Sequence, residues 1–263
     1  MCTLIVSFRQ HSEVPVVVAA NRDEVRSRPA TGPHRWENEA FVAPRDELAK
    51  GTWLGVTAHG LFVGVTNRFP AERFPDRRSR GALVVDALKK PSALALHQAL
   101  AVLDPKTSNA FHLLYADTTD AFVTWSDGEV LRQSVLEPGL HVVTERSLGG
   151  DDRARQSLIE ERWPLLPVVE GLPTAAGLQA LLGSSRPDDS VGGLCVDVPQ
   201  LNYGTRSSLV LFLNRRLAAS RFFWADGSPD RTPFVERPEL IASLAESCFD
   251  GPHGLHLLPH SGR

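Results

Sequence analysis

The segment TLIVSF (residues 3–8) is followed, across a polar turn at residues 10–13, by PVVVAA (residues 15–20). Both apolar segments are rich in β-branched residues, which favour strands. Strands joined by so short a turn pair in the antiparallel direction. The fold is therefore expected to begin with a β-hairpin, and Cys2 stands at the start of its first strand.

Further strands are expected wherever apolar runs of strand length are separated by short turns rich in Gly, Asp or Asn. This pattern predicts a second hairpin, a β-meander followed by one short strand, and a last hairpin near the carboxyl end. The expected strands are residues 53–57, 61–66, 110–116, 121–125, 130–135, 140–144, 206–213 and 217–224. The segment 22–35 is dense in Arg, Pro and Gly, and we expect it to be a loop.

Helices are expected where apolar residues recur on one helical face or where a capping residue precedes such a segment. The expected helices are residues 80–90, 92–103, 151–163, 174–182 and 238–247. Helices grouped between hairpins predict an α+β sandwich, in which two antiparallel sheets lie between helical layers. We expect a single domain over residues 1–263, with a flexible carboxyl-terminal tail from about residue 249.

The composition excludes several classes of protein. A chain of 263 residues with 42% hydrophobic and 22% charged residues is typical of a globular protein rather than a disordered one. A net charge of −3 argues against a nucleic-acid partner, and no apolar run reaches the roughly 18 residues of a membrane span. Three cysteines cannot form a disulfide framework and no signal peptide is recognisable, so we expect a cytoplasmic protein.

Most catalytic motifs are missing from the sequence, which contains no G-x-S-x-G, H-E-x-x-H, Walker A or G-x-G-x-x-G pattern. A histidine cluster near the carboxyl end either binds a metal or, as we favour, belongs to a flexible tail, so no metal site is predicted. A run of arginines either receives an acidic substrate or forms a solvated loop, and we favour the loop. The histidines are His253, His256 and His260, and the arginines are Arg68, Arg73, Arg77, Arg78 and Arg80.

Cys2 is the strongest catalytic candidate. The small side chain at position 2 permits removal of Met1, which would leave a thiol and a free α-amine on one residue. An α-amine has a reference pKa of about 7.7–8.0, which suits a general base at neutral pH. Cys2 would then be a nucleophile that carries its own base. The alternative is a cysteine that stands at position 2 by chance.

Several sequence blocks resemble the NRDE family, which includes transport and Golgi organisation protein 2. They occur in the right order and span nearly the whole chain. They are MCT (residues 1–3), ANRDE (20–24) with Arg28-Pro29, GTWLG (51–55), VTNR (65–68), SRG (79–81) and YGTRSS (203–208). The family is similar in layout to the N-terminal-nucleophile hydrolases, notably bile-salt hydrolase and penicillin V acylase.

This resemblance implies a four-layer αββα sandwich and cleavage of a non-peptide linear amide, or a thioester, through an acyl-enzyme on Cys2. A small-molecule acyl amide is the implied substrate, and no cofactor is required. In the acylases an Arg and an Asp near the end of the second strand steady the thiolate and the α-amine. Arg22 and Asp23 are the matching residue types, but neighbours on a strand point to opposite faces. Either the strand has ended there, or Asn21 and Glu24 take those places instead.

Three more positions are implied by the resemblance. Asn67 matches the asparagine of the oxyanion hole, and Arg206 matches a late active-site arginine. A second active-site asparagine is expected near residue 144, where this chain has Glu145 instead. An ionised carboxylate cannot donate a hydrogen bond, so one oxyanion donor is expected to be missing. We expect Cys2, Asn67 and Arg206 to converge in one cavity.

A binding protein on the same fold is the alternative function. The NRDE family is associated with haem trafficking and with lipid or acyl-CoA homeostasis. The resemblance therefore also implies a non-catalytic protein that binds or transports haem or an acyl lipid. Haem would then be a ligand, held by His or Cys, although the sequence singles out no ligand pair.

Overall fold

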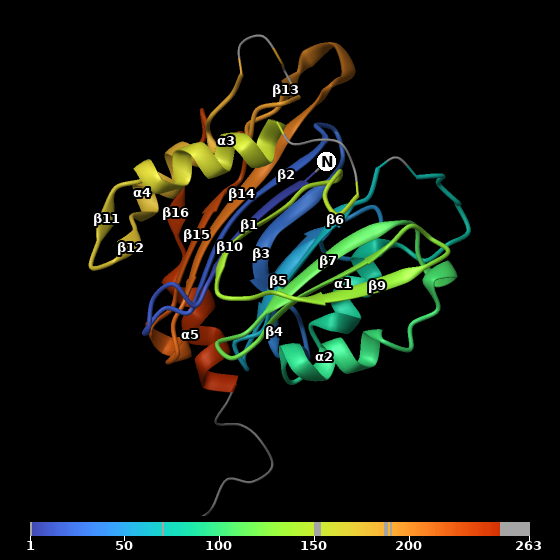
Figure 1. Ribbon diagram of the computed structural model, residues 1–263, viewed down its shortest axis with the longest axis horizontal. Helices are drawn as coiled ribbons and strands as arrows, with labels where there is room; N and C mark the ends of the chain where they lie inside the picture. The colour runs from blue at the N-terminus through green and yellow to red at the C-terminus, as the bar shows by residue number, and fades with distance from the viewer. Residues whose placement is uncertain (1, 70, 150–153, 187–188, 190, 248–263) are drawn as a thin grey trace, which may run out of the picture.

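The computed structural model describes residues 2–69, 71–149, 154–186, 189 and 191–247, and Figure 1 shows how these parts are arranged. They form two seven-stranded sheets and a small two-stranded sheet, and all the strand pairs within them are antiparallel. The expected tail from about residue 249, with its three histidines, lies outside the described residues.

The first sheet is built around the amino-terminal hairpin. Its order is β10-β1-β2-β14-β15-β16, and β13 pairs with β14. The strands are β1 (Cys2–Phe8), β2 (Val16–Val25), β10 (Gly139–Val143), β13 (Asp197–Val198), β14 (Tyr203–Leu213), β15 (Arg221–Ala225) and β16 (Val235–Glu236). The pairing of β1 with β2 runs from Cys2 opposite Arg22 to Phe8 opposite Val16, so the expected hairpin is confirmed.

The second sheet follows chain order from β3 to β9. Its strands are β3 (Ala30–Arg35), β4 (Phe41–Asp46), β5 (Leu54–Thr57), β6 (Phe62–Asn67), β7 (Phe111–Ala116), β8 (Ala121–Ser126) and β9 (Leu131–Val135). The prediction of a loop over residues 22–35 is wrong, because β2 continues to Val25 and β3 follows at residues 30–35. Strand β3 is an edge strand with an irregular register between Thr31 and His34, and such strands accept proline.

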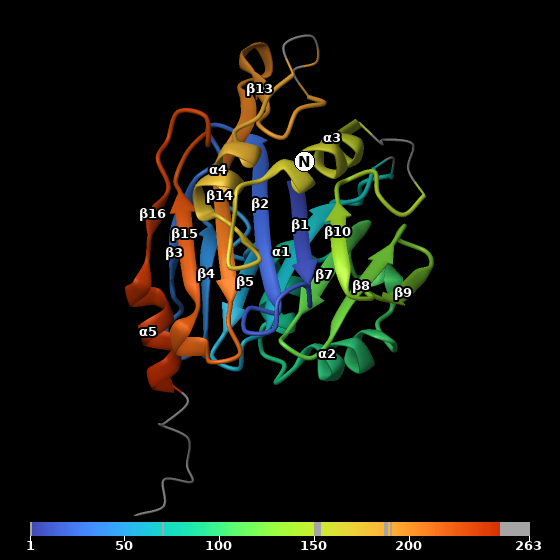
Figure 2. The same cartoon turned by 60° about the vertical axis from the view of Figure 1, so that its left-hand side comes forward.

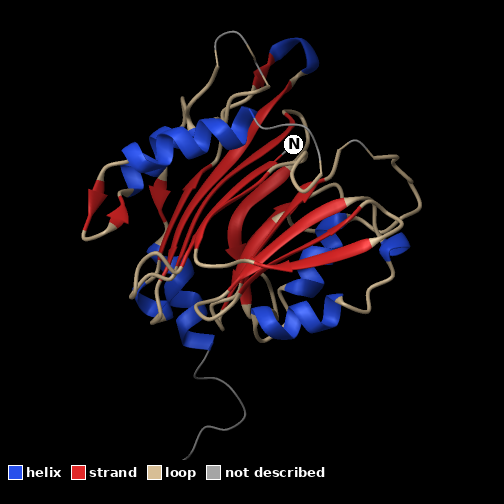
Figure 3. Cartoon of the chain, viewed as in Figure 1, coloured by secondary structure: helices blue, strands red, loops and turns tan. Residues whose placement is uncertain are grey.

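Helices cover the outer faces of both sheets. Helices α1 and α2 pack on the second sheet, and α4 packs on β2 and β14 of the first. Figure 3 shows these blue helices outside the red strands, and Figure 2 shows α3 and α4 in front of the first sheet. The expected αββα sandwich is confirmed. The helices are α1 (Arg80–Ala87), α2 (Ala93–Leu100), α3 (Ala154–Arg162), α4 (Ala175–Leu182) and α5 (Pro238–Ser247).

Side-chain caps start three of these helices. Ser79, Ser92 and Thr174 each accept a hydrogen bond from the backbone N–H three residues later, as the sequence predicts for Ser92. The predicted strand 217–224 is shorter than expected. A 3₁₀ turn at Leu217–Ala219 precedes β15, and further 3₁₀ turns lie at Pro105–Thr107, Trp163–Leu165 and Pro199–Leu201. The short strands β11 (Val168–Val169) and β12 (Leu172–Pro173) form the third sheet.

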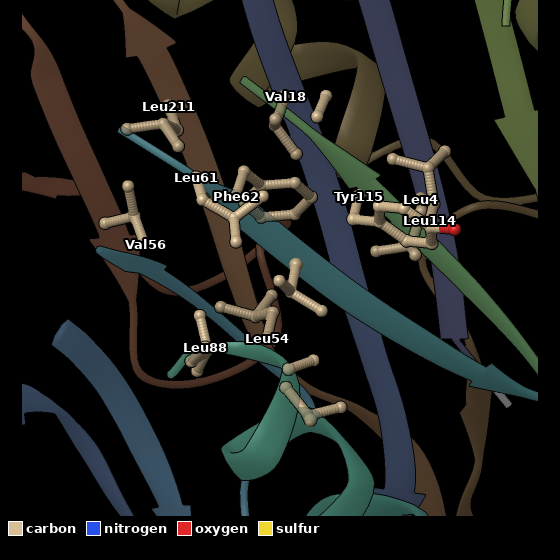
Figure 4. Packing of buried hydrophobic residues seen from close by; sticks show 14 of the residues in the cluster. Leu4, Val18, Leu54, Val56, Leu61, Phe62, Leu88, Leu114, Tyr115 and Leu211 are labelled. Carbon is tan, nitrogen blue, oxygen red and sulfur yellow. The ribbon is translucent and has the colours of Figure 1, made fainter. Parts of the chain in front are cut away.

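Two apolar clusters separate the layers. Leu4 and Val6 of β1 belong to the cluster between the sheets, whereas Ile5 belongs to the cluster under α3 and α4. Figure 4 shows Leu4 among Val18, Leu114 and other residues from both sheets. Because side chains alternate along a strand, Cys2 shares the inter-sheet face of Leu4. None of the helices in the described part of the chain is both long and apolar enough to span a membrane.

Candidate active site

A cavity of about 430 Å³ lies where β1 begins, and Cys2 lines it. Arg22 and Glu24 line the same cavity from β2, because that strand continues to Val25 and alternate residues share the face of Cys2. The Arg22 guanidinium lies 3.9 Å from the centre of a Trp53 ring and donates to Asp46 over 2.8 Å. Arg22 is thereby fixed by stacking and by an ion pair, next to the thiol.

The side chains of Asn21 and Asp23 belong to the opposite face of β2. Asn21 donates to the carbonyl oxygens of Leu182 and Leu194, over 3.0 and 2.8 Å. Asn21 does not line the cavity, whereas Glu24 does. The alternative in which Asn21 and Glu24 both face the thiol is therefore wrong for Asn21. Asp23 accepts a hydrogen bond from Thr205 at 2.7 Å on that same outer face, and part of the residue also reaches the cavity.

Arg155 of α3 is a residue that the sequence analysis missed. Its side chain is fully buried and forms ion pairs with Asp23 at 3.4 Å and with Glu145 at 3.6 Å. It also donates to the Thr3 hydroxyl at 3.1 Å. Arg155 therefore links the residues beside Cys2 to the helical layer. The signal in the sequence is a charged residue three positions before Leu158, on the buried face of the helix.

Burial governs the protonation of the site. Burial raises the pKa of the Cys2 thiol, and the Asp23 charge raises it further while Arg22 lowers it. Burial also raises the pKa of the Asp23 carboxyl, against the opposing effect of Arg155. A thiol with a raised pKa is protonated at neutral pH, so it needs a base before it can attack a substrate.

Asn67 lies at the exposed end of β6 and lines two cavities. The second cavity has a volume of about 440 Å³ and shares a wall with the first, formed by Asn67, Arg73, Arg80 and Asn109. Glu145 lines this second cavity, and only 4% of its surface is exposed. The structure brings Asn67 to the cavity of Cys2, while Glu145 is paired with a buried cation.

Arg206 does not join Cys2 and Asn67, so the expected convergence of all three is wrong. The register of β14 against β2 shifts between Thr205 and Ser207, which leaves Arg206 as the extra residue of a bulge. It lines a neighbouring small cavity with Trp224 instead, and Arg22 and Trp53 stand between this cavity and the main one because they line both. Because the bulge follows from pairing between distant strands, the sequence motif could not predict where Arg206 lies.

The glycines of the GTWLG and SRG blocks bring the start of α1 against the loop before β5. A Cβ atom on Gly51 would overlap the backbone of Gly81 and lie 2.8 Å from the Ala82 nitrogen. Thr52 donates its backbone N–H to the Gly81 carbonyl at 3.3 Å. This backbone contact holds Ser79 and Arg80 at the cavity wall, which explains why small residues are needed in both blocks.

The predicted arginine run divides between the cavities and the surface. Arg73, Arg77 and Arg80 line the main cavity, and Arg68 lines the second. Arg78 lines neither and pairs with Asp86 at the surface. Among the described residues, no three His, Cys, Asp or Glu side chains form a group that could hold a metal.

The comparisons with known proteins agree with this architecture. The chain is 26% identical to the Transport and Golgi organization protein 2 homolog of Bos taurus over 232 residues, which cover 76% of this chain and 82% of that protein. The Mus musculus homolog is 29% identical over 106 residues, and that match spans 39% of this chain and only 38% of the mouse protein.

Among solved structures, the Caenorhabditis elegans ortholog of N-acylethanolamine-hydrolyzing acid amidase has a similar fold. Its TM-score is 0.55 at 14% identity, over 80% of this chain and 92% of that chain. The family model of Transport and Golgi organisation 2 matches residues 1–170. The chain therefore belongs to the Transport and Golgi organisation 2 family.

Proposed function

We propose that the protein is an N-terminal-cysteine hydrolase that cleaves a non-peptide linear amide, or a thioester, through an acyl-enzyme on Cys2. The observation that carries the proposal is the position of Cys2 in a cavity that Arg22 and Asn67 also line. The nematode protein of similar fold is named for the hydrolysis of N-acylethanolamines, which are amides of this kind.

The proposed reaction uses the α-amine that removal of Met1 would supply. The amine accepts the thiol proton while sulfur bonds to the substrate carbonyl carbon, and the Asn67 amide donates to the resulting oxyanion. The proton then passes to the leaving nitrogen, the C–N bond breaks and an amine departs. Water attacks the thioester in the same way and releases the acid. A base is required because burial raises the pKa of the Cys2 thiol.

Mass spectrometry of the intact protein tests this proposal. We expect loss of Met1 and, on incubation with acyl amides and acyl thioesters, an acyl adduct on Cys2 that Cys2→Ala abolishes. We expect Asn67→Ala to slow acylation about 100- to 1000-fold, as for loss of an oxyanion donor elsewhere. Cys195→Ser is the control, because the Cys195 thiol is buried beside Ser228 and lines no cavity described above.

Three outcomes would overturn the hydrolase: retention of Met1, an adduct that persists in Cys2→Ala, or no adduct with any compound. The second candidate is a non-catalytic protein that binds haem or an acyl lipid. Glu145 favours it, because a buried carboxylate paired with Arg155 stands near the place of an expected amide donor. A haem absorbance shift on titration, with no acylation of Cys2, would support this second function.

A further inference from the structure

The two cavities meet at a pair of arginines. Arg73 and Arg80 both line the main cavity and the second cavity, together with Asn67 and Asn109. Arg80 is the first residue of α1, and its guanidinium donates to the Ala110 carbonyl at 3.1 Å. The junction therefore places two guanidinium groups beside the proposed oxyanion donor.

The other arginines of the main cavity already have carboxylate partners. Arg22 and Arg28 pair with Asp46 at 2.8 and 2.6 Å, and Glu24 lies 4.0 and 3.8 Å from them. A further cavity arginine, in the segment before α1, pairs with a surface glutamate, as Arg77 and Glu129 lie 3.5 Å apart. The positive charges of these arginines are therefore largely balanced by the carboxylates that pair with them.

Arg73 and Arg80 differ from that set. Within the described part of the chain, neither Arg73 nor Arg80 has a carboxylate oxygen within 4 Å, the distance limit for an ion pair. Glu72 also lines the second cavity, but it forms no ion pair with either arginine. Burial lowers the pKa of Arg80 and the nearby Arg73 charge lowers it further, whereas Cys2 and Glu24 raise it. Two cations that line the same junction, one of them partly buried, favour an anion between them.

The segment that bears Arg73 is held in place over the cavities. Phe74 donates its backbone N–H to the Asn109 side-chain oxygen at 2.7 Å, and Asn109 donates back to the Phe74 carbonyl at 2.9 Å. Arg77 lies 4.0 Å from the centre of the Phe74 ring and donates to the Gly128 carbonyl at 3.0 Å. Arg73 directly precedes Phe74, so this contact restrains its backbone and less backbone entropy is lost when Arg73 binds a ligand.

We propose that Arg73 and Arg80 form an anion-binding subsite, and that the acyl substrate carries a carboxylate a few bonds from the carbonyl that Cys2 attacks. The substrate class rests on the proposed hydrolase function. Two guanidinium groups that converge on one carboxylate give strong, directional hydrogen bonds. The first turn of α1 adds the positive end of its dipole, because Arg80 and Gly81 both line the main cavity.

Calorimetric titration of the full chain with Cys2→Ala tests the subsite without turnover. The probes are N-octanoylglycine, its methyl ester, and butanedioic acid mono-N-octylamide with its own methyl ester. One acid has its carboxylate on the amine side of the amide and the other on the acyl side. We expect at least one acid to bind about 10- to 100-fold more tightly than its ester, which is the effect of a charge-assisted pair.

We expect Arg73→Gln and Arg80→Gln each to reduce that acid-to-ester ratio about tenfold, and added salt to reduce it as well. Arg78→Gln is the matched control in the same segment, because Arg78 pairs with Asp86 at the surface and should leave the ratio unchanged. Equal binding of acid and ester in both pairs would overturn the subsite, as would a ratio that survives in the Arg73→Gln/Arg80→Gln double variant.

The same compounds separate this subsite from the hydrolase. If Cys2→Ala prefers the acids through Arg73 and Arg80 but the unmodified Cys2 forms no acyl adduct, the hydrolase fails and the anion subsite stands. If Cys2 is acylated equally fast by acids and esters, the hydrolase stands and the anion subsite fails.

Discussion

At the scale of single residues, four neighbours on β2 have four different roles. Asn21 binds carbonyl groups of the outer layer, and Arg22 stacks on Trp53 inside the sandwich. Asp23 pairs with Arg155, and Glu24 lies at the cavity. The alternation of the strand assigns these roles, because it sends successive side chains to opposite faces.

Arg155 is the residue whose loss should affect stability most directly. Arg155→Met would leave Asp23 and Glu145 buried without their cation, and we expect a loss of about 3–5 kcal/mol in the free energy of unfolding. Urea unfolding measures this loss. Arg162→Met in the exposed part of the same helix should change it by less than about 0.5 kcal/mol. Equal stability of Arg155→Met and the parent chain would contradict the structural role.

At the scale of elements, the backbone contact between α1 and the loop before β5 shapes the cavity. Gly51 and Gly81 allow the two segments to approach, and Ser79 caps the helix at the contact. A helix of eight residues has little stability of its own, so its position depends on such tertiary contacts.

Gly51→Ala should displace α1. The added Cβ would overlap the Gly81 backbone, and we expect a cost of roughly 1–3 kcal/mol in stability together with slower acylation of Cys2. Chemical unfolding and adduct formation measure the two effects. Gly32→Ala is the control, because its Cβ would meet only the Trp224 ring nitrogen at an ordinary 3.6 Å. A Gly51→Ala protein with normal stability and acylation would show that the contact is dispensable.

At the scale of the whole molecule, His112 lies in a network that joins the two sheets. Thr66 of β6 hydrogen-bonds the His112 ring at 3.1 Å and the carbonyl of Thr144, just after β10, at 3.2 Å. Arg68 lies 2.9 Å from the other ring nitrogen and donates to the Leu148 carbonyl at 3.1 Å. Burial, assisted by the Arg68 charge, lowers the pKa of His112 to about 4.

This shift predicts how stability depends on pH. Between pH 6.5 and about 4 the unfolded chain binds a proton at His112 that the folded chain does not, so stability falls as the pH falls through this window. The full contribution is about 3 kcal/mol. Unfolding free energies measured from pH 7 to 4 should decline less steeply in His112→Gln, whereas exposed His59→Gln should follow the parent chain. Parallel curves for the parent and His112→Gln would refute the assignment.

Local patterns explain what could be predicted and what could not. The hairpins, the helix caps and the position of Cys2 at the start of a strand depend on residues close together in the chain, so periodicity and turn chemistry predict them. The same reasoning missed β3, because Pro33 in a Gly- and Arg-rich segment is read as a loop unless the strand is known to lie at an edge.

The sequence by itself determined the αββα layers and the presence of Cys2 at the first strand, together with the family blocks around it. Only the tertiary structure decided that Arg206 leaves the site and that Arg155 supports it, and that Arg73 and Arg80 meet between two cavities. The physical reason is distance along the chain. Strand register, bulges and buried ion pairs join residues far apart in sequence, and no local pattern records which of them meet.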